Sequence, residues 1–341
     1  MRPFRVTAAS AALLLALWSG CGGDDAAGPG QTALTSLAIV GSFVPAAPLC
    51  YVEDISVSGS YAYLADNFIN TPGNETHGLY VVDVSNPSQP KQAGFVKISS
   101  LQTVHVSGAY LYVGTPSRLY IYTLADPKSP VEVGVYGPAN VTDVHVLGTY
   151  AYVADKTGGL IVVNVANKSL PTLAGSVNPP GDHSQGVYVD GSYAYVTDTD
   201  SGLALVNVAN PASPTVTTRF STTKSLVADD YAYAHAHASG NYLYVADLFG
   251  LRVFNVTNKS SIAKVSSFDP KGPGTHIWVD GARAYLLDQE NGVRLIDIAN
   301  PLAPKEFAYG DSPGLARGIH LSGGYIYIAD YADGMCIFKV P

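Results

Sequence analysis

The chain has 341 residues, of which 13% are charged, about half the proportion that is usual in soluble domains. Its formal net charge of −8 argues against a nucleic-acid-binding protein, because a phosphate-binding face needs clustered lysine and arginine, and the sequence contains no basic run. The 34 glycines and 23 tyrosines are typical of a chain built from short strands and tight turns.

Residues 1–20 differ in composition from the rest of the chain. Arg2 and Arg5 give the segment a positively charged start, and a short apolar stretch follows from Val6 to Trp18. This stretch is too short to span a bilayer as a helix, and it predicts a signal for export.

The end of this segment, Trp18-Ser19-Gly20-Cys21, resembles the cleavage box of bacterial lipoproteins, in which small residues precede a cysteine. Trp18 departs from that pattern, which usually has leucine there. The resemblance implies that Cys21 becomes a lipidated N-terminus and anchors the protein at a membrane surface without a spanning helix. An ordinary secreted protein with an unmodified Cys21 is the alternative. Residues 21–35 are rich in Gly, Asp, Ala and Pro and predict a flexible tether.

From residue 36 onward a short pattern recurs seven times, which predicts a seven-bladed β-propeller with one blade per repeat. In most repeats a glycine is followed by Tyr-x-Tyr, an aspartate and a long apolar run. The anchor glycines are Gly59, Gly108, Gly148, Gly191, Gly240, Gly281 and Gly323. A single blade cannot bury both of its faces, so we expect one closed domain over residues 36–341.

Four strands are expected in each repeat. The first alternates polar and apolar residues, as in Asp54–Val57, and a glycine with positive φ then forms a hairpin. The second is aromatic, as in Tyr61–Asp66, and the third is apolar on both faces, as in Leu79–Val84. Neighbouring blades would cover both of those faces. A turn at Asn-Pro or Asp-Pro then leads to a short fourth strand, such as Leu173–Val177.

The third strands carry a resemblance to a known family. Leu79-Tyr-Val-Val-Asp83, Leu160-Ile-Val-Val-Asn164 and Val293-Arg-Leu-Ile-Asp297 resemble the LVIVD repeat of bacterial and archaeal surface proteins. The resemblance covers residues 36–341 and implies a surface β-propeller, but little chemistry. Blades 2 and 7 depart from the pattern, at Tyr122-Thr123 and Phe338-Lys339.

The seventh repeat ends after three strands, and residues 37–44 resemble the fourth strands of other repeats. We therefore expect the N-terminal strand to complete the last blade and close the ring, which removes two open sheet edges. Cys336 opens the third strand of blade 7, and Cys50 follows the strand expected to pair with it. Antiparallel pairing favours a disulfide between them, which an exported protein permits. Two separate thiols, buried or reactive, are the alternative.

Two columns of polar side chains recur through the repeats. Seven residues after the anchor glycine lie Asp66, Asp155, Asp198, Asp247, Asp288 and Asp330, with Thr115 as the exception. We interpret these carboxylates as acceptors for turn amides rather than as cation ligands. Three residues before the glycine lie Ser56, His105, His145, Tyr188, His237, Trp278 and His320. We interpret this column as inter-blade packing, with a metal or proton-handling site as the alternative.

The best candidates for a binding site are side chains that break the repeat pattern. His235 and His237 share one face of a strand, a geometry that metal ions use when a third ligand is available. Further candidates lie where connecting loops lead into blades 1, 4, 6 and 7, namely Glu53, Asp54, His183, His276, Arg317 and His320. We expect all these loops at one end of the ring, where ligands usually bind. No catalytic residue is assigned, and a divalent metal is the one cofactor that this set could hold.

These patterns favour a non-enzymatic propeller that is lipid-anchored in the bacterial cell envelope, at the outer membrane or the cell surface. It would bind a protein or glycan partner through the face that bears these loops, because tyrosine-rich surfaces with few charges suit such recognition. The alternative is a metal-assisted hydrolase with an axial pocket lined by His235, His237, His276 or His320. The fold alone cannot name the ligand, since propellers host many functions.

Overall fold

The computed structural model describes residues 34–46, 50–68, 76–179, 183–198, 202–220, 235–270 and 272–341. All the regular secondary structure in these ranges is β-strand. The strands form seven sheets, which are the blades of a propeller. Within the same ranges no helix is long and apolar enough to cross a membrane. The predicted export signal (residues 1–20), Cys21 and most of the predicted tether lie outside the described residues.

Each blade has four antiparallel strands. Blade 1 comprises β3 (Val52–Ser58), β4 (Tyr61–Asp66), β5 (Gly78–Asp83) and β6 (Lys91–Lys97). Blade 2 comprises β7 (Thr103–Ser107), β8 (Tyr110–Gly114), β9 (Leu119–Thr123) and β10 (Val131–Tyr136). Blade 3 comprises β11 (Val141–Leu147), β12 (Tyr150–Asp155), β13 (Gly159–Asn164) and β14 (Thr172–Val177). Blade 4 comprises β15 (Ser184–Asp190), β16 (Tyr193–Asp198), β17 (Gly202–Asn207) and β18 (Thr215–Phe220).

The remaining blades follow the same order. Blade 5 comprises β19 (His235–Ser239), β20 (Tyr242–Asp247), β21 (Gly250–Asn255) and β22 (Ala263–Phe268). Blade 6 comprises β23 (Gly274–Asp280), β24 (Arg283–Asp288), β25 (Gly292–Asp297) and β26 (Lys305–Gly310). Blade 7 comprises β27 (Gly318–Ser322), β28 (Tyr325–Ala329), β29 (Met335–Lys339) and, on its outer side, β2 (Ile39–Phe43).

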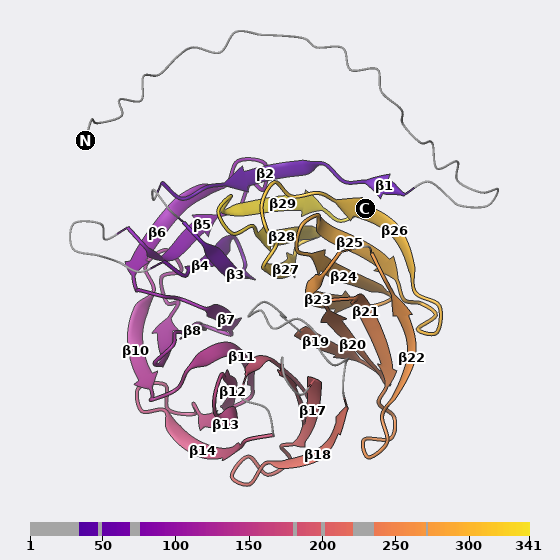
Figure 1. The fold of residues 1–341 in the computed structure, drawn as a ribbon. Coiled ribbons are helices and arrows are strands. Elements are labelled where there is room, and N and C mark those ends of the chain that lie inside the picture. The colour runs from indigo at the N-terminus through magenta and orange to yellow at the C-terminus, as the bar shows by residue number, and fades with distance from the viewer. Residues whose placement is uncertain are drawn as a thin grey trace, which may run out of the picture. The chain divides into compact units, whose positions relative to one another are not determined.

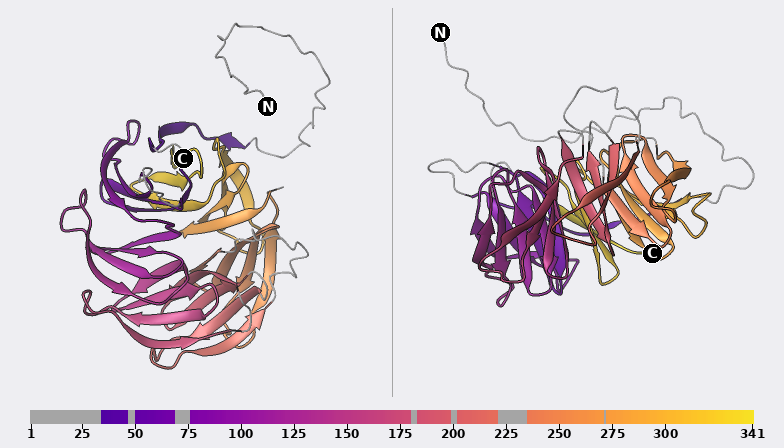
Figure 2. Two further views of the ribbon diagram at one scale, coloured as in Figure 1. Left: turned by 60° about the vertical axis from the view of Figure 1, so that its left-hand side comes forward. Right: turned by 90° about the horizontal axis from the view of Figure 1, so that it is seen from below.

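The first strand of every blade lies nearest the axis of the ring (Figure 1). These strands contact one another in order from β3 to β27, and β27 contacts β3, so the ring is closed. The edge-on view in Figure 2 shows that the described ring is a disc one blade deep. This arrangement confirms the predicted seven-bladed propeller.

The anchor glycines form the hairpins between the first and second strands, as predicted. All seven have a positive φ, between 55° and 61°. An ideal Cβ at any of them would meet no other atom within 4 Å, so the backbone angle, and not a lack of space, selects glycine there. Glycine recurs at this position in every blade because the turn needs a positive φ, which a residue without a Cβ adopts readily.

The N-terminal strand closes the ring, as predicted. β2 pairs antiparallel with β29, with Ser42 opposite Cys336 and Phe43 opposite Met335. A second contact was not predicted: β1 (Thr35–Ser36) pairs in parallel with β26 of blade 6. The segment from Thr35 to Phe43 therefore pairs first with the outer strand of blade 6 and then supplies the fourth strand of blade 7.

Seven hydrophobic clusters fill the seven interfaces between neighbouring blades. Strands supply both of their faces to this core. On β4, Ala62 and Leu64 face blade 7, whereas Tyr63 and Ala65 face blade 2. This alternation confirms that the apolar strands are covered on both sides by neighbouring blades.

The predicted disulfide does not form, since Cys50 and Cys336 are both free and buried. On β29, Met335 and Ile337 point toward blade 1 and share a cluster with Cys50. Cys336 points the other way and packs beside Phe338 against blade 6. Successive side chains of a strand face opposite sides of the sheet, so the two thiols lie on opposite faces of blade 7. The prediction rested on where the cysteines lie along the chain, whereas the faces on which their side chains lie exclude the bond.

Two thiols are therefore expected after unfolding without a reductant, because no bond joins Cys50 to Cys336. Burial raises the pKa of both thiols, so neither should react quickly in the native protein. Titration of a Cys21→Ser variant with a thiol reagent, before and after denaturation, measures both quantities. A denatured protein without free thiols would show that the disulfide exists.

Candidate functional site

The axis of the ring is lined by side chains of the innermost strands, which begin at one face of the disc, called here the upper face. Side chains three residues before the anchor glycines form a belt around the axis, called here the aromatic belt. It consists of His105, His145, Tyr188, His237, Trp278 and His320. Neighbouring ring centroids in the belt are 4.4 to 5.8 Å apart.

Ser56 of blade 1 occupies the same position but carries no ring, and its hydroxyl accepts a hydrogen bond from the Val106 amide at 3.1 Å. Ring contacts between neighbouring blades confirm the packing interpretation of this column. In the belt, His237 Nδ1 accepts a hydrogen bond from the Val279 amide at 3.4 Å.

The belt surrounds a cavity of about 140 Å³, called here the belt cavity. Its histidines are neutral near pH 7. Burial lowers the pKa of His105 to about 3, and those of His237 and His320 to about 4. Burial also lowers the pKa of His145. The cavity wall therefore combines neutral imidazoles with the rings of Tyr188 and Trp278.

A second cavity of about 60 Å³ lies at the upper face and is called here the upper cavity. It shares Asp54, Asp143, His235 and His276 with the belt cavity, so the two adjoin. The side chains of these four residues belong to one column, five residues before the anchor glycines. In blade 7 the same position is Gly318, where a Cβ would lie 2.8 Å from Asp54 Oδ1. A glycine there leaves room for the carboxylate.

β-Bulges bring a second polar column into the upper cavity. The pairing of β3 with β4 shifts at Glu53, and the same shift occurs at Thr142 in blade 3 and at Gln185 in blade 4. A bulge lets consecutive residues, such as Glu53 and Asp54, line the same cavity. Regular alternation would have turned one member of each pair away.

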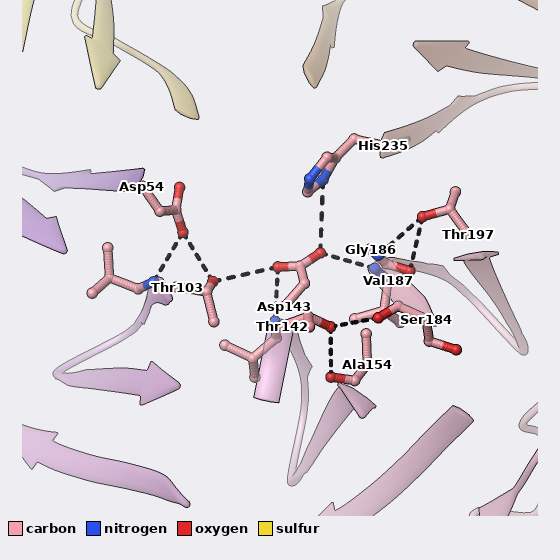
Figure 3. A network of polar contacts seen from close by, with 12 residues as sticks. Asp54, Thr103, Thr142, Asp143, Ala154, Ser184, Gly186, Val187, Thr197 and His235 are labelled. Atoms are coloured by element: carbon pink, nitrogen blue, oxygen red, sulfur yellow. Dashed lines mark hydrogen bonds and ion pairs between the residues drawn. The ribbon is translucent and has the colours of Figure 1, made fainter. Parts of the chain in front are cut away.

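Two carboxylates, Asp54 and Asp143, line both cavities and belong to one network of polar contacts (Figure 3). Asp54 Oδ2 accepts hydrogen bonds from the Thr103 hydroxyl and the Val104 amide, both at 2.9 Å. Asp143 Oδ2 accepts one from the Val187 amide at 2.8 Å. Each carboxylate thus joins its own blade to the inner strand of the next blade.

Burial raises the pKa of Asp54 to about 7 and that of Asp143 to about 6. The opposing effect of backbone hydrogen bonds is smaller, and for Asp54 the charge of Asp143 adds to the rise. Opposite them lie His235 and His276, whose rings stack with centroids 3.9 Å apart. Burial lowers the pKa of His235 to about 4 and that of His276 well below its usual value.

The seam between blades 7 and 1 carries an aromatic and charged cluster beside the upper cavity, called here the seam cluster. Its members are Tyr51, Glu53, Phe68, Arg317 and Tyr331. Tyr51 stacks on Tyr331 with centroids 4.5 Å apart, and the Arg317 guanidinium lies 5.1 Å from the centroid of the Tyr331 ring. Arg317 Nε also lies 3.7 Å from Glu53 Oε2. Tyr331 has a φ of 44°, a strained value for a residue other than glycine.

The structure brings together most of the candidate residues predicted from sequence. Glu53, Asp54, His235, His276 and Arg317 line the upper cavity. The belt cavity is lined by His237 and His320, together with Asp54, His235 and His276.

His183 lines neither cavity, and its backbone amide donates to Asp198. The sequence reasoning missed Asp143, although it occupies the same repeat position as Asp54, His235 and His276. Comparing that column across repeats would have found it.

The aspartates that follow the second strands serve turns, as interpreted from sequence. Asp155 Oδ1 accepts from the Thr157 and Gly158 amides, and Asp247 and Asp288 make equivalent bonds. The described residues contain no group of three or more His, Cys, Asp or Glu side chains placed to hold one metal ion. The metal-assisted hydrolase stays a prediction.

Comparisons with known proteins agree with this architecture. No curated protein sequence matches the chain. Three similar solved structures are the Pan2 WD40 domain of Neurospora crassa, the periplasmic gluconolactonase PpgL of Pseudomonas aeruginosa and BamB of Moraxella catarrhalis.

The Pan2 domain is 11% identical, with a TM-score of 0.65 over 91% of this chain and 95% of that domain. The gluconolactonase is 14% identical, with a TM-score of 0.61 over 85% of this chain and 88% of the enzyme. BamB is 14% identical, with a TM-score of 0.54 over 84% of this chain and 81% of BamB. Identities this low establish a common fold and nothing about activity.

The family model of the LVIVD repeat matches seven consecutive segments. They are residues 50–97, 100–137, 138–179, 181–222, 236–270, 271–309 and 313–338. The segments follow the seven blades and cover most of the chain. The chain therefore belongs to the LVIVD repeat family.

Proposed function

We propose that the protein is a non-catalytic propeller, lipid-anchored in the bacterial cell envelope, that binds a protein partner through its upper face. The seam cluster is the observation that supports this proposal most. Tyrosine and arginine are enriched at the energetic centres of protein interfaces, and the cluster holds both beside the axis. The strained backbone at Tyr331 indicates that this arrangement is maintained at a cost to stability.

A protein partner is favoured over a glycan by the geometry of the rings. Sugar binding by stacking needs an accessible aromatic face. The ring of Tyr51 stacks on the ring of Tyr331, and the Arg317 guanidinium lies close to the centroid of the same Tyr331 ring. The faces of the Tyr331 ring are therefore engaged within the protein. The ring edges and phenolic hydroxyls of Tyr51 and Tyr331, which are both half-buried, can make directional contacts with a partner.

The proposal is tested with a photo-crosslinking amino acid placed in the full-length chain. We expect position 51, in the seam cluster, to capture one envelope protein. The control is position 242, next to the Gly240 hairpin at the opposite face, which should not capture it. Adding Tyr331→Ala should weaken the capture from position 51. The proposal fails if both positions give the same products, or if purified envelope polysaccharide binds the seam cluster instead.

The lipid anchor is tested separately through Cys21, which lies outside the described residues. A Cys21→Ser variant is expected to move from the membrane fraction to the soluble fraction, because lipidation is then impossible and no other anchor is proposed. Fractionation and metabolic labelling with a radioactive fatty acid measure this change. An unlabelled, soluble protein with Cys21 intact would instead indicate ordinary secretion.

A further inference from the structure

The two axial cavities contain more negative than positive charge. Of the described residues that line the upper cavity, Glu53, Asp54 and Asp143 are acidic and Arg317 is the one permanent cation. Arg317 lies beside Glu53. Among the described residues, no lysine or arginine forms an ion pair with Asp54 or Asp143.

The histidines do not supply the missing charge. His235 Nδ1 lies 3.9 Å from Asp143 Oδ2, but this imidazole and the stacked His276 are neutral near pH 7. The Thr103 hydroxyl has one proton and lies closer to Asp54, at 2.9 Å, than to Asp143, at 3.5 Å. Carboxylates out of bulk water are normally paired with a cation, so these two are incompletely compensated.

The aromatic belt supplies the second half of a site. On each inner strand, the carboxylate column and the belt column are two residues apart, which separates them by about 6.6 Å along the strand. Aromatic faces attract cations and also accept aliphatic carbon. Both columns line the belt cavity, whose 140 Å³ is well above the volume that one water needs.

We infer that the axis binds a small organic cation, with an ammonium head between Asp54 and Asp143 and a short aliphatic tail in the aromatic belt. In n-butylammonium the terminal carbon lies about 5 Å from the nitrogen at ordinary bond lengths, so the tail covers most of the roughly 6.6 Å from the carboxylate column to the belt column. A cation there would relieve the repulsion between the two carboxylates that contributes to the raised pKa of Asp54. This inference does not depend on the protein partner proposed for the upper face.

A divalent metal is the competing cation, and the two make different demands on the site. A metal needs several lone pairs aimed at one point. Asp54 and Asp143 already direct oxygens at the backbone amides of Val104 and Val187. An ammonium group needs only proximity to carboxylates and ring faces, which this wall provides.

The test is calorimetric titration of the full-length protein at pH 8 with n-butylammonium, 1-butanol, Ca²⁺ and Zn²⁺. We expect n-butylammonium to bind with 1:1 stoichiometry and at least about tenfold more tightly than 1-butanol, which has nearly the same shape without the charge. Absence of saturable binding, equal binding of the alcohol, or tighter 1:1 binding of either metal ion would overturn the inference.

Variants locate the site. Asp143→Asn should weaken n-butylammonium binding at least about tenfold, because it removes a carboxylate charge at the cavity wall. Asp190→Asn, at an exposed hairpin, should leave it unchanged. Trp278→Leu should weaken it about threefold by removing one ring face, and it provides a second measurement if Asp143→Asn fails to fold. Unchanged affinity in both axial variants would show that the cation binds elsewhere.

Discussion

Replacing Gly41 by valine is expected to destabilise the protein by about 3 kcal/mol. Gly41 lies on β2, the strand that closes the ring, and an ideal Cβ at this position would lie 2.0 Å from the Pro87 carbonyl oxygen of blade 1. The obstacle is backbone, so no side-chain rotation removes the clash. β2 would have to move away from blade 1, which weakens the packing of blade 7 against blade 1.

The matched control is Ser42→Val. Ser42 neighbours Gly41 on β2 and is exposed, and valine suits a strand, so this variant should stay within about 0.5 kcal/mol of wild type. Urea unfolding of both variants measures the difference. Equal stability of the two variants would mean that β2 does not pack against the turn of blade 1.

Acidification from pH 7 to pH 4.5 is expected to lower the free energy of unfolding by several kcal/mol, with about 1.4 kcal/mol per pH unit for each proton taken up on unfolding. Burial lowers the pKa of six axial histidines: His105, His145, His235, His237, His276 and His320. Below about pH 6.5 these side chains protonate more readily in the unfolded chain than in the folded one. Protons then favour unfolding, so this stability is lost as the pH falls.

The raised pKa values of Asp54 and Asp143 act in the opposite direction, since these carboxyls gain protons in the folded state between pH 7 and pH 4. Burial also raises the pKa of Glu53, Asp247, Glu306 and Asp330, so these carboxyls oppose the histidines in the same way and make the net loss of stability smaller than six histidines alone would give. Urea unfolding at several pH values measures the slope. A His237→Gln variant should show a slope smaller by about one proton. Constant stability from pH 7 to pH 4.5 would contradict the neutral state of the belt histidines.

Sequence patterns predicted many of the individual site residues but not how they are arranged. Residues that interrupt the repeat, such as Glu53, His235 and Arg317, were found from the sequence because deviation from a strict repeat is visible in one dimension. Their grouping was not. Asp143 comes within 3.9 Å of His235 although blade 4 lies between them, and Gly186 at the intervening position has no side chain to separate them. The seam cluster likewise joins Tyr51 from the start of the ring to Tyr331 from its end.

The sequence by itself determined the number of blades, the hairpin glycines and the closure by an N-terminal strand. These features are local and repeated, so each of seven copies reports the same backbone requirement. Only the tertiary structure decided which side chains meet. Closing the ring places residues from different blades around one axis, and the strand alternation sends Cys336 and Cys50 to opposite faces of blade 7. These side-chain contacts depend on strand register and on the packing of segments that are distant in the sequence. No single repeat contains that information.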